Sequence, residues 1–228
     1  MTSGIDWQAI GLSVRLAFVV VAILLVLGTP LAWWLTFRRR RWTFLVEAIV
    51  SMPLVLPPTV LGFYMLLAMG PNSPLGKAWE RITGHGLAFT FEGLVLASLF
   101  YSLPFVVQPI AAAFAQLDRA VLEASATLGA SPWRTFTRVT LPLSRDGLVT
   151  AVVLGFAHTL GEFGVVLMVG GNLPGVTRTV SISIYDQVQA FDLAAANATA
   201  LLLLALSFAA LATAYGVLRK PWAVAPLA

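Results

Sequence analysis

The chain has 228 residues, of which 59% are hydrophobic and only 11% are charged. Soluble domains carry about 25% charged residues, so most of this chain must face lipid or other apolar helices. It contains no cysteine, which excludes disulfides and thiolate metal sites. Its two histidines, His85 and His158, are too far apart for a local metal-ligand motif. The net charge of +4 does not indicate nucleic-acid binding, because the basic residues lie at the ends of apolar runs.

Five apolar stretches are long enough to cross a bilayer, which requires about 20 residues for about 30 Å of hydrocarbon. They run from about 10 to 37, 44 to 69, 91 to 117, 148 to 169 and 194 to 218. The sequence therefore predicts an all-α, multi-pass integral membrane protein with about five transmembrane helices in one domain over residues 1–228. A cleaved signal peptide is not expected, because the basic cluster follows the first apolar run instead of preceding it.

The distribution of Lys and Arg predicts how the spans are oriented. One predicted side of the membrane carries Arg38, Arg39, Arg40, Arg41, Arg119, Arg134, Arg138, Arg145, Arg219 and Lys220. The other side carries only Lys77, Arg81 and Arg178, while Arg15 lies inside the first span near its outer end. Because basic residues favour the cytoplasmic side, the N-terminus is predicted to lie outside and the C-terminus inside. Arg15 is expected to be a snorkelling anchor.

The loop between the third and fourth predicted spans has the most specific local pattern. Asp118 is suited to cap a short helix, and Gly129 suits the left-handed residue that ends it. Ser131 can cap a second helix with Pro132 at its first position, and Pro142 is expected to end that helix before the fourth span. The loop is therefore predicted to form two short helices joined by a sharp turn at the membrane surface. A solvated amphipathic connector is the simpler alternative.

The same loop, about residues 118–142, resembles the EAA loop of ABC importer permeases. The family pattern is Glu-Ala-Ala, three residues, Gly, nine residues and Ile-x-Leu-Pro. The matching positions here are Glu123, Ala124, Ser125, Gly129, Val139, Leu141 and Pro142. The chain departs from the pattern at Ser125, where the family has Ala, and at Val139, where it has Ile. Both departures are small in size.

In that family the loop is a coupling helix that docks in a groove on a separate ATPase subunit. The resemblance implies coupling to the ATPase by Glu123, Ala124, Ser125, Gly129, Ser131, Pro132, Leu141 and Pro142. The chain has no phosphate-binding Gly-x-x-x-x-Gly-Lys-Ser/Thr motif. It is therefore expected not to be an enzyme and to hold no cofactor or metal, with ATP and Mg²⁺ bound by the partner. The implied assembly is a homodimer in the cell inner membrane with two ATPase subunits and an extracytoplasmic molybdate-binding protein.

Two further segments resemble the oxyanion branch of these permeases, which includes molybdate, tungstate and sulfate transporters. They are residues 52–62, Met-Pro-Leu-Val-Leu-Pro-Pro-Thr-Val-Leu-Gly, and residues 160–164, Leu-Gly-Glu-Phe-Gly. Residues 171–185 are most similar to the molybdate permeases. The resemblance implies a type I (MetI-like) permease core that imports molybdate by alternating access, with tungstate or sulfate as alternatives. An ion-coupled secondary anion transporter would predict two pseudo-symmetric halves, and no internal repeat is visible.

Polar or helix-breaking residues in and beside the spans are candidates for the translocation path or gate. They are Pro57, Pro58, Thr59, Glu162, Asn172, Thr177 and Ser181. The prolines remove backbone donors, which is tolerated where protein or a water-filled cavity satisfies the freed carbonyls; a packing kink away from the path is the alternative. Glu162 lies one turn after His158 and could hydrogen-bond it, and the pair could line the path or face a neighbouring helix. Residues 172–183 could form an outer gate, dip into the membrane or be an ordinary surface loop.

Overall fold

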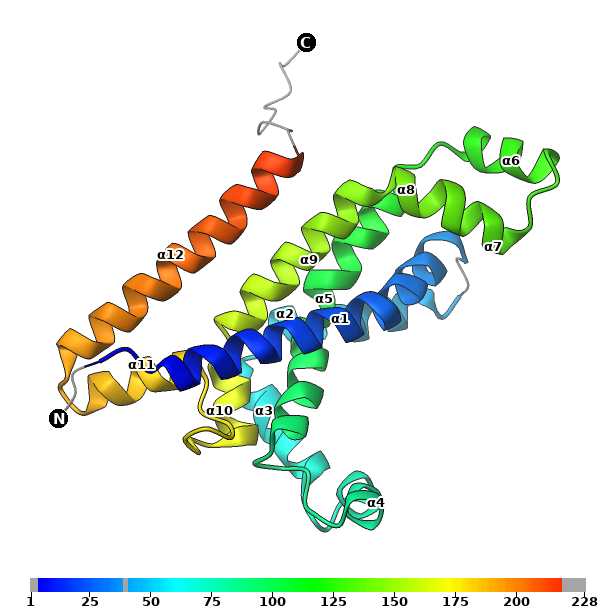
Figure 1. Ribbon diagram of the computed structural model, residues 1–228. Coiled ribbons are helices and arrows are strands. Elements are labelled where there is room, and N and C mark those ends of the chain that lie inside the picture. The colour runs from blue at the N-terminus through cyan, green and yellow to red at the C-terminus, as the bar shows by residue number, and fades with distance from the viewer. Residues whose placement is uncertain (1–3, 39–40, 219–228) are drawn as a thin grey trace.

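The computed structural model describes residues 4–38 and 41–218, and every regular element within these ranges is a helix (Figure 1). The long helices are α1 (Trp7–Phe37), α5 (Phe91–Ala115), α9 (Arg145–Leu160) and α12 (Leu193–Leu218). The shorter ones are α2 (Thr43–Val55), α3 (Pro58–Met69), α4 (Pro74–Thr83), α6 (Arg119–Thr127), α7 (Pro132–Thr135), the π-helical turn η1 (Phe136–Thr140), α8 (Leu141–Leu143), α10 (Gly164–Gly170) and α11 (Val180–Gln189). Arg39, Arg40, Arg219 and Lys220, which contribute to the predicted orientation, lie outside the described residues.

Three helices, α1, α5 and α12, are long and apolar enough to cross a membrane. The number rises to five if each of two bent pairs forms one span. One pair is α2 with α3, and the other is the helical run of residues 132–143 with α9. The all-helical prediction is confirmed, and the count of about five spans agrees with the upper figure.

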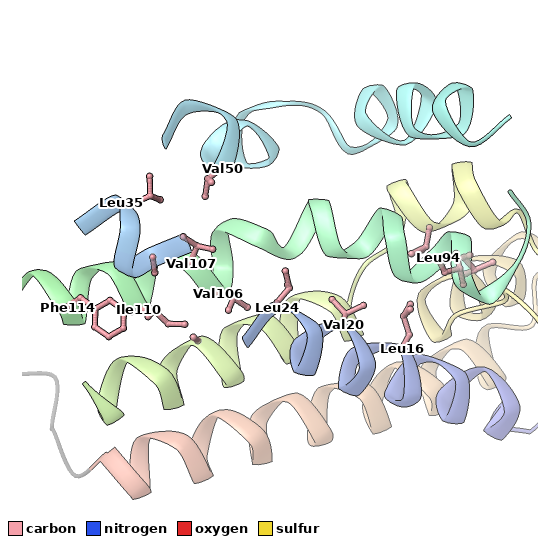
Figure 2. Packing of buried hydrophobic residues seen from close by; sticks show 14 residues of the cluster. Leu16, Val20, Leu24, Leu35, Val50, Leu94, Val106, Val107, Ile110 and Phe114 are labelled. Carbon is pink, nitrogen blue, oxygen red and sulfur yellow. The ribbon is translucent and has the colours of Figure 1, made fainter. Parts of the chain in front are cut away.

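The core is built around α5, which contacts α1, α2, α3, α9 and α10. On α1 the buried residues Leu16, Val20 and Leu24 repeat every four positions, so they form one apolar stripe facing α5. Figure 2 shows Leu24, at one end of this stripe, beside Val106 of α5. By contrast, α12 contacts mainly α9 and α11 and stands apart from the bundle in Figure 1, so most of its apolar surface is available to lipid or to a partner chain.

A seam of small residues joins α9 to α5. Gly147, Ala151, Gly155 and Thr159 are all buried and occur every fourth residue on α9. A Cβ at position 147 would lie 2.3 Å from the Cβ of Ala113, so the two helices touch almost backbone to backbone. Small residues are the usual means of close helix packing in membranes, where burial against lipid supplies no hydrophobic driving force.

The second predicted span, 44–69, is not one helix. It breaks between α2 and α3, and the two pieces are bent by 116°. Pro57 and Pro58 supply the reason, because neither can donate the backbone hydrogen bond that a continuous helix requires. Pro57 is extended, with φ −55° and ψ 134°, and Pro58 takes the first position of α3, where a missing N–H costs least.

The fourth predicted span, 148–169, is also corrected. Helix α9 ends at Leu160, and α10 begins only at Gly164, so Glu162 lies in a break and not in the middle of a helix. Gly164 lies so close to α3 that a Cβ there would be 2.7 Å from the Cβ of Pro58. The broken segment is thus held by the packing of α10 against α3, a long-range contact that hydropathy does not reveal.

Candidate functional site

The candidate coupling loop forms a hairpin of α6 and α7 that projects from one end of the bundle (Figure 1). The predicted caps are confirmed. Asp118 accepts a hydrogen bond from the Ala120 N–H at 2.9 Å, and Ser131 accepts one from the Arg134 N–H at 3.3 Å. Gly129 has φ +78°, in the left-handed region that favours glycine. The chain therefore turns sharply at Gly129, as the sequence predicts.

Most of the predicted coupling residues are exposed. On the hairpin they are Glu123, Ala124, Gly129, Ser131 and Pro132, and Pro142 is exposed on α8, beyond the hairpin. Two others are placed differently. The Ser125 hydroxyl lies 2.8 Å from that of Thr135 and joins α6 to α7, so it braces the hairpin from inside. Leu141 is half-buried against the main core at the base of the loop.

Two large apolar side chains on the hairpin were missed by the sequence reasoning. Leu128 is 88% exposed and Trp133 is 72% exposed. They flank the turn at Gly129 and give the hairpin tip an exposed apolar surface, which is typical of a protein–protein contact. Their position on either side of the predicted turn at Gly129, where exposure is expected, is the signal that could have identified them as part of a docking surface.

The second loop helix was predicted to end at Pro142, and this prediction is wrong. The helical run continues to Leu143 and bends by 70° only where α9 begins. Just before the proline the helix widens into η1, in which the Leu141 N–H donates to the Phe136 carbonyl five residues earlier. This wider turn accommodates a proline that cannot donate its own hydrogen bond.

Phe136 links the hairpin to the transmembrane helices, a role that the sequence did not reveal. Its ring packs edge-to-face against Trp33 of α1 and Phe114 of α5, with both centroids 6.4 Å away. It also lies against Trp133 of the hairpin, at 5.8 Å. A force on the hairpin can therefore reach both α1 and α5 through one aromatic cluster.

The two helix breaks meet on one side of the bundle, because α3 packs against α10. Each helix has a glycine at the contact: Gly164 lies against Pro58, and Gly62 lies so close to Met168 that a Cβ would be 2.8 Å from the Met168 Cβ. Pro57, Pro58 and Thr59 are exposed at the start of α3. The predicted path residues of this segment are thus accessible and sit on a tightly packed pair of half-helices.

Glu162 belongs to a buried polar cluster between α5 and the end of α9. Its side chain is only 4% exposed, and Ser98 donates a hydrogen bond to its Oε2 at 2.8 Å. Ser102 lies 3.0 Å from His158 Nδ1 and 2.9 Å from the Thr159 hydroxyl. Within the described residues, no hydrogen bond joins His158 to Glu162. The two side chains therefore hydrogen-bond separately to α5, the neighbouring helix, and do not form the predicted pair.

The predicted outer-gate residues organise a folded loop at the opposite end from the hairpin. Thr177 is buried and donates to the Gly170 carbonyl at 2.6 Å. Asn172 donates to Asp186 at 2.5 Å and accepts from the Arg178 Nε at 2.6 Å. Ser181 is half-buried in the first turn of α11. Asn172 and Thr177 therefore hold the loop together, and neither joins Pro57–Thr59 or Glu162 in one site.

Replacing Ser98 with Ala is expected to destabilise the protein by about 1–3 kcal/mol, because it leaves a buried carboxylate without its donor. Glu162 Oε1 already has no hydrogen-bond partner within the described residues, so Oε2 has the only one. Thermal unfolding in detergent measures the change. Ser51→Ala is the control, since the Ser51 hydroxyl accepts from an exposed Gln108. Equal melting temperatures for the two variants would contradict the prediction.

The described residues thus form a bundle with three to five candidate membrane spans, two of them broken, and an exposed hairpin, an arrangement suited to a membrane protein. The family model described as "Binding-protein-dependent transport system inner membrane component" matches residues 24–220. The chain belongs to this family of membrane transport subunits.

The chain is similar to several curated molybdenum transport system permease proteins. It is 54% identical over 192 residues to that of Azotobacter vinelandii, and the matched residues make up 84% of this chain and 85% of the relative. It is 37% identical over 188 residues to that of Escherichia coli K12, which covers 81% of this chain and 80% of the relative.

Solved structures share its fold at low sequence identity. A chain from the inward-facing MetNI methionine ABC transporter gives a TM-score of 0.74 at 19% identity. The aligned residues make up 94% of this chain and 95% of the transporter chain. A chain from a bacterial ABC importer of alginate gives 0.76 at 16% identity, with 95% and 79% covered. The MetI-like permease core predicted from the sequence is therefore confirmed as the fold.

Proposed function

We propose that this chain is the membrane-spanning permease subunit of an ATP-driven importer that carries molybdate across the cell inner membrane. The observation that carries the proposal is the 54% identity, over most of both chains, to a molybdenum transport permease. The exposed hairpin with its positive-φ turn at Gly129 supports the coupling part of the proposal, because it offers a protruding surface to a separate ATPase.

The proposed assembly is a homodimer, since the chain has one coupling hairpin and two ATPase subunits must each be engaged. The N-terminus lies outside, where an anion-binding protein delivers substrate, and the ATPases bind at the hairpins inside. When ATP closes the ATPase dimer, the hairpins move together. The aromatic cluster around Phe136 passes this motion to α1 and α5, and the half-helix pair α3–α10 moves with α5, which it contacts.

Sulfate is the second candidate substrate. The chain is 35% identical to the chloroplastic sulfate permease 2 of Chlamydomonas reinhardtii, over 90% of this chain and 55% of the relative. Molybdate and sulfate are both tetrahedral dianions, so the same path could admit either. The lower identity to the sulfate permease favours molybdate, and tungstate remains an alternative within the same chemistry.

A deletion strain tests the substrate. Cells that lack this chain are expected to lose molybdoenzyme activity at low external molybdate and to regain it at high molybdate, which enters by a less specific route. Growth on sulfate as the sulfur source is the control and should be unchanged. Normal high-affinity molybdate uptake together with lost growth on sulfate would transfer the assignment to sulfate.

A further inference from the structure

A groove of about 490 Å³ lies between α1, α4 and α5, at the end of the bundle opposite the coupling hairpin. Its walls are apolar residues of the two candidate spans α1 and α5, among them Val19, Val95 and Leu99. Because α1 and α5 cross the membrane, the apolar part of this groove lies at the depth of lipid chains. The amphipathic helix α4 closes one end of it with Trp79.

Three residues with polar groups line the same groove, and among the described residues none of these groups makes a hydrogen bond or an ion pair with another protein group. Arg15 is exposed on α1 and stacks on the Phe91 ring, with its guanidinium carbon 4.4 Å from the ring centroid. The Trp79 Nε1 is buried and has no hydrogen-bond acceptor among the described residues. Glu92 lies in the first turn of α5, and in the same part of the chain no ion pair joins it to Arg15.

These groups define the chemistry of a missing ligand. An arginine exposed on a membrane span is costly unless a counter-ion meets it, and a buried indole N–H normally finds an acceptor. The exposed Arg15 guanidinium suits a phosphate group, whereas the enclosed Trp79 N–H is not reached from the groove. The Glu92 carboxylate repels a purely anionic headgroup, but it accepts hydrogen bonds from an ammonium group. The combination matches a zwitterion in which a phosphate is followed by a primary ammonium.

We infer that the groove binds a phospholipid with a primary ammonium headgroup, namely phosphatidylethanolamine from the surrounding bilayer. Its phosphate accepts from Arg15, and its ammonium donates to Glu92. One acyl chain lies along the apolar wall formed by α1 and α5. The site is separate from the breaks at Pro57 and Glu162 and from the coupling hairpin.

Native mass spectrometry of the intact transporter, purified in mild detergent, tests the inference. The probes are phosphatidylethanolamine, phosphatidylcholine and phosphatidylglycerol with identical acyl chains. The wild type is expected to retain phosphatidylethanolamine above both others, because phosphatidylcholine has no ammonium proton to donate and phosphatidylglycerol has no cation for Glu92. Arg15→Gln should weaken this binding about fivefold, which corresponds to about 1 kcal/mol of attraction between one arginine and a lipid surface.

Matched variants distinguish lipid binding in this groove from the general effect of removing one positive charge. Arg81→Gln removes the same charge from an exposed position on α4 that does not line the groove, and it should bind like the wild type. Glu92→Gln should remove the preference for phosphatidylethanolamine over phosphatidylcholine. Arg15→Lys keeps the positive charge and should bind more tightly than Arg15→Gln, which provides a second variant if Arg15→Gln does not fold. Equal loss in Arg15→Gln and Arg81→Gln, or no headgroup preference in the wild type, would overturn the inference.

Discussion

Replacing Gly129 with Asp is expected to abolish transport largely while leaving a normal amount of the protein in the membrane. Gly129 has φ +78°, where a residue with a Cβ is penalised by about 1 kcal/mol or more. A Cβ here would meet no heavy atom within 4 Å, so the new side chain projects from the hairpin tip toward any docked subunit. The transmembrane helices do not depend on this turn, and the chain should still insert.

Gly84→Asp is the matched control for this variant. Gly84 also has φ +78°, also has open space around its Cβ position, and ends α4 at the other end of the bundle. Both variants carry the same backbone strain and the same new charge, but only Gly129→Asp should uncouple. Glu123→Ala should be milder than Gly129→Asp, since it removes one polar contact and keeps the helix. Anion uptake, substrate-dependent ATP hydrolysis and co-purification of the ATPase measure the outcome; normal uptake by Gly129→Asp would disprove the coupling role.

Replacing Gly147 with Ala is expected to destabilise the folded bundle by about 1–3 kcal/mol, the usual cost of overpacking a tight contact. The added Cβ would lie 2.3 Å from the Ala113 Cβ and 2.9 Å from the Pro109 carbonyl oxygen. A backbone carbonyl cannot move aside as a flexible side chain can, so α9 must separate from α5. Because α5 is the centre of the core, membrane abundance should fall together with transport.

Gly11→Ala provides the control, because Gly11 also lies in a helix but a Cβ there meets nothing within 4 Å. Alanine favours the helix by up to about 1 kcal/mol over glycine, so this variant should be as stable as the wild type or slightly more stable. Thermal unfolding of both purified proteins gives the comparison. A Gly147→Ala protein that melts with the wild type would show that α5 and α9 can separate without cost.

Local chemistry made the coupling hairpin predictable. Asp118, Gly129 and Ser131 act on backbone groups within a few residues, so their caps and turn follow from sequence spacing alone, and the structure has them where they were predicted. Pro142 was predicted to end its helix by the same reasoning. It does not, because a wider π-helical turn before it accommodates the ring, a solution that depends on how the loop is anchored to the bundle by Phe136.

The sequence by itself determined that the protein is helical and membrane-embedded, because apolar length and the scarcity of charge leave no other stable arrangement in lipid. It also indicated the breaks, since prolines at 57 and 58 cannot continue a helix. Only the tertiary structure decided which residues pack and hydrogen-bond around those breaks. The packing of α10 on α3 through Gly62 and Gly164, and the pairing of Glu162 with Ser98 of α5, join residues far apart in the chain, and contacts of that kind depend on how the helices pack and not on any local pattern.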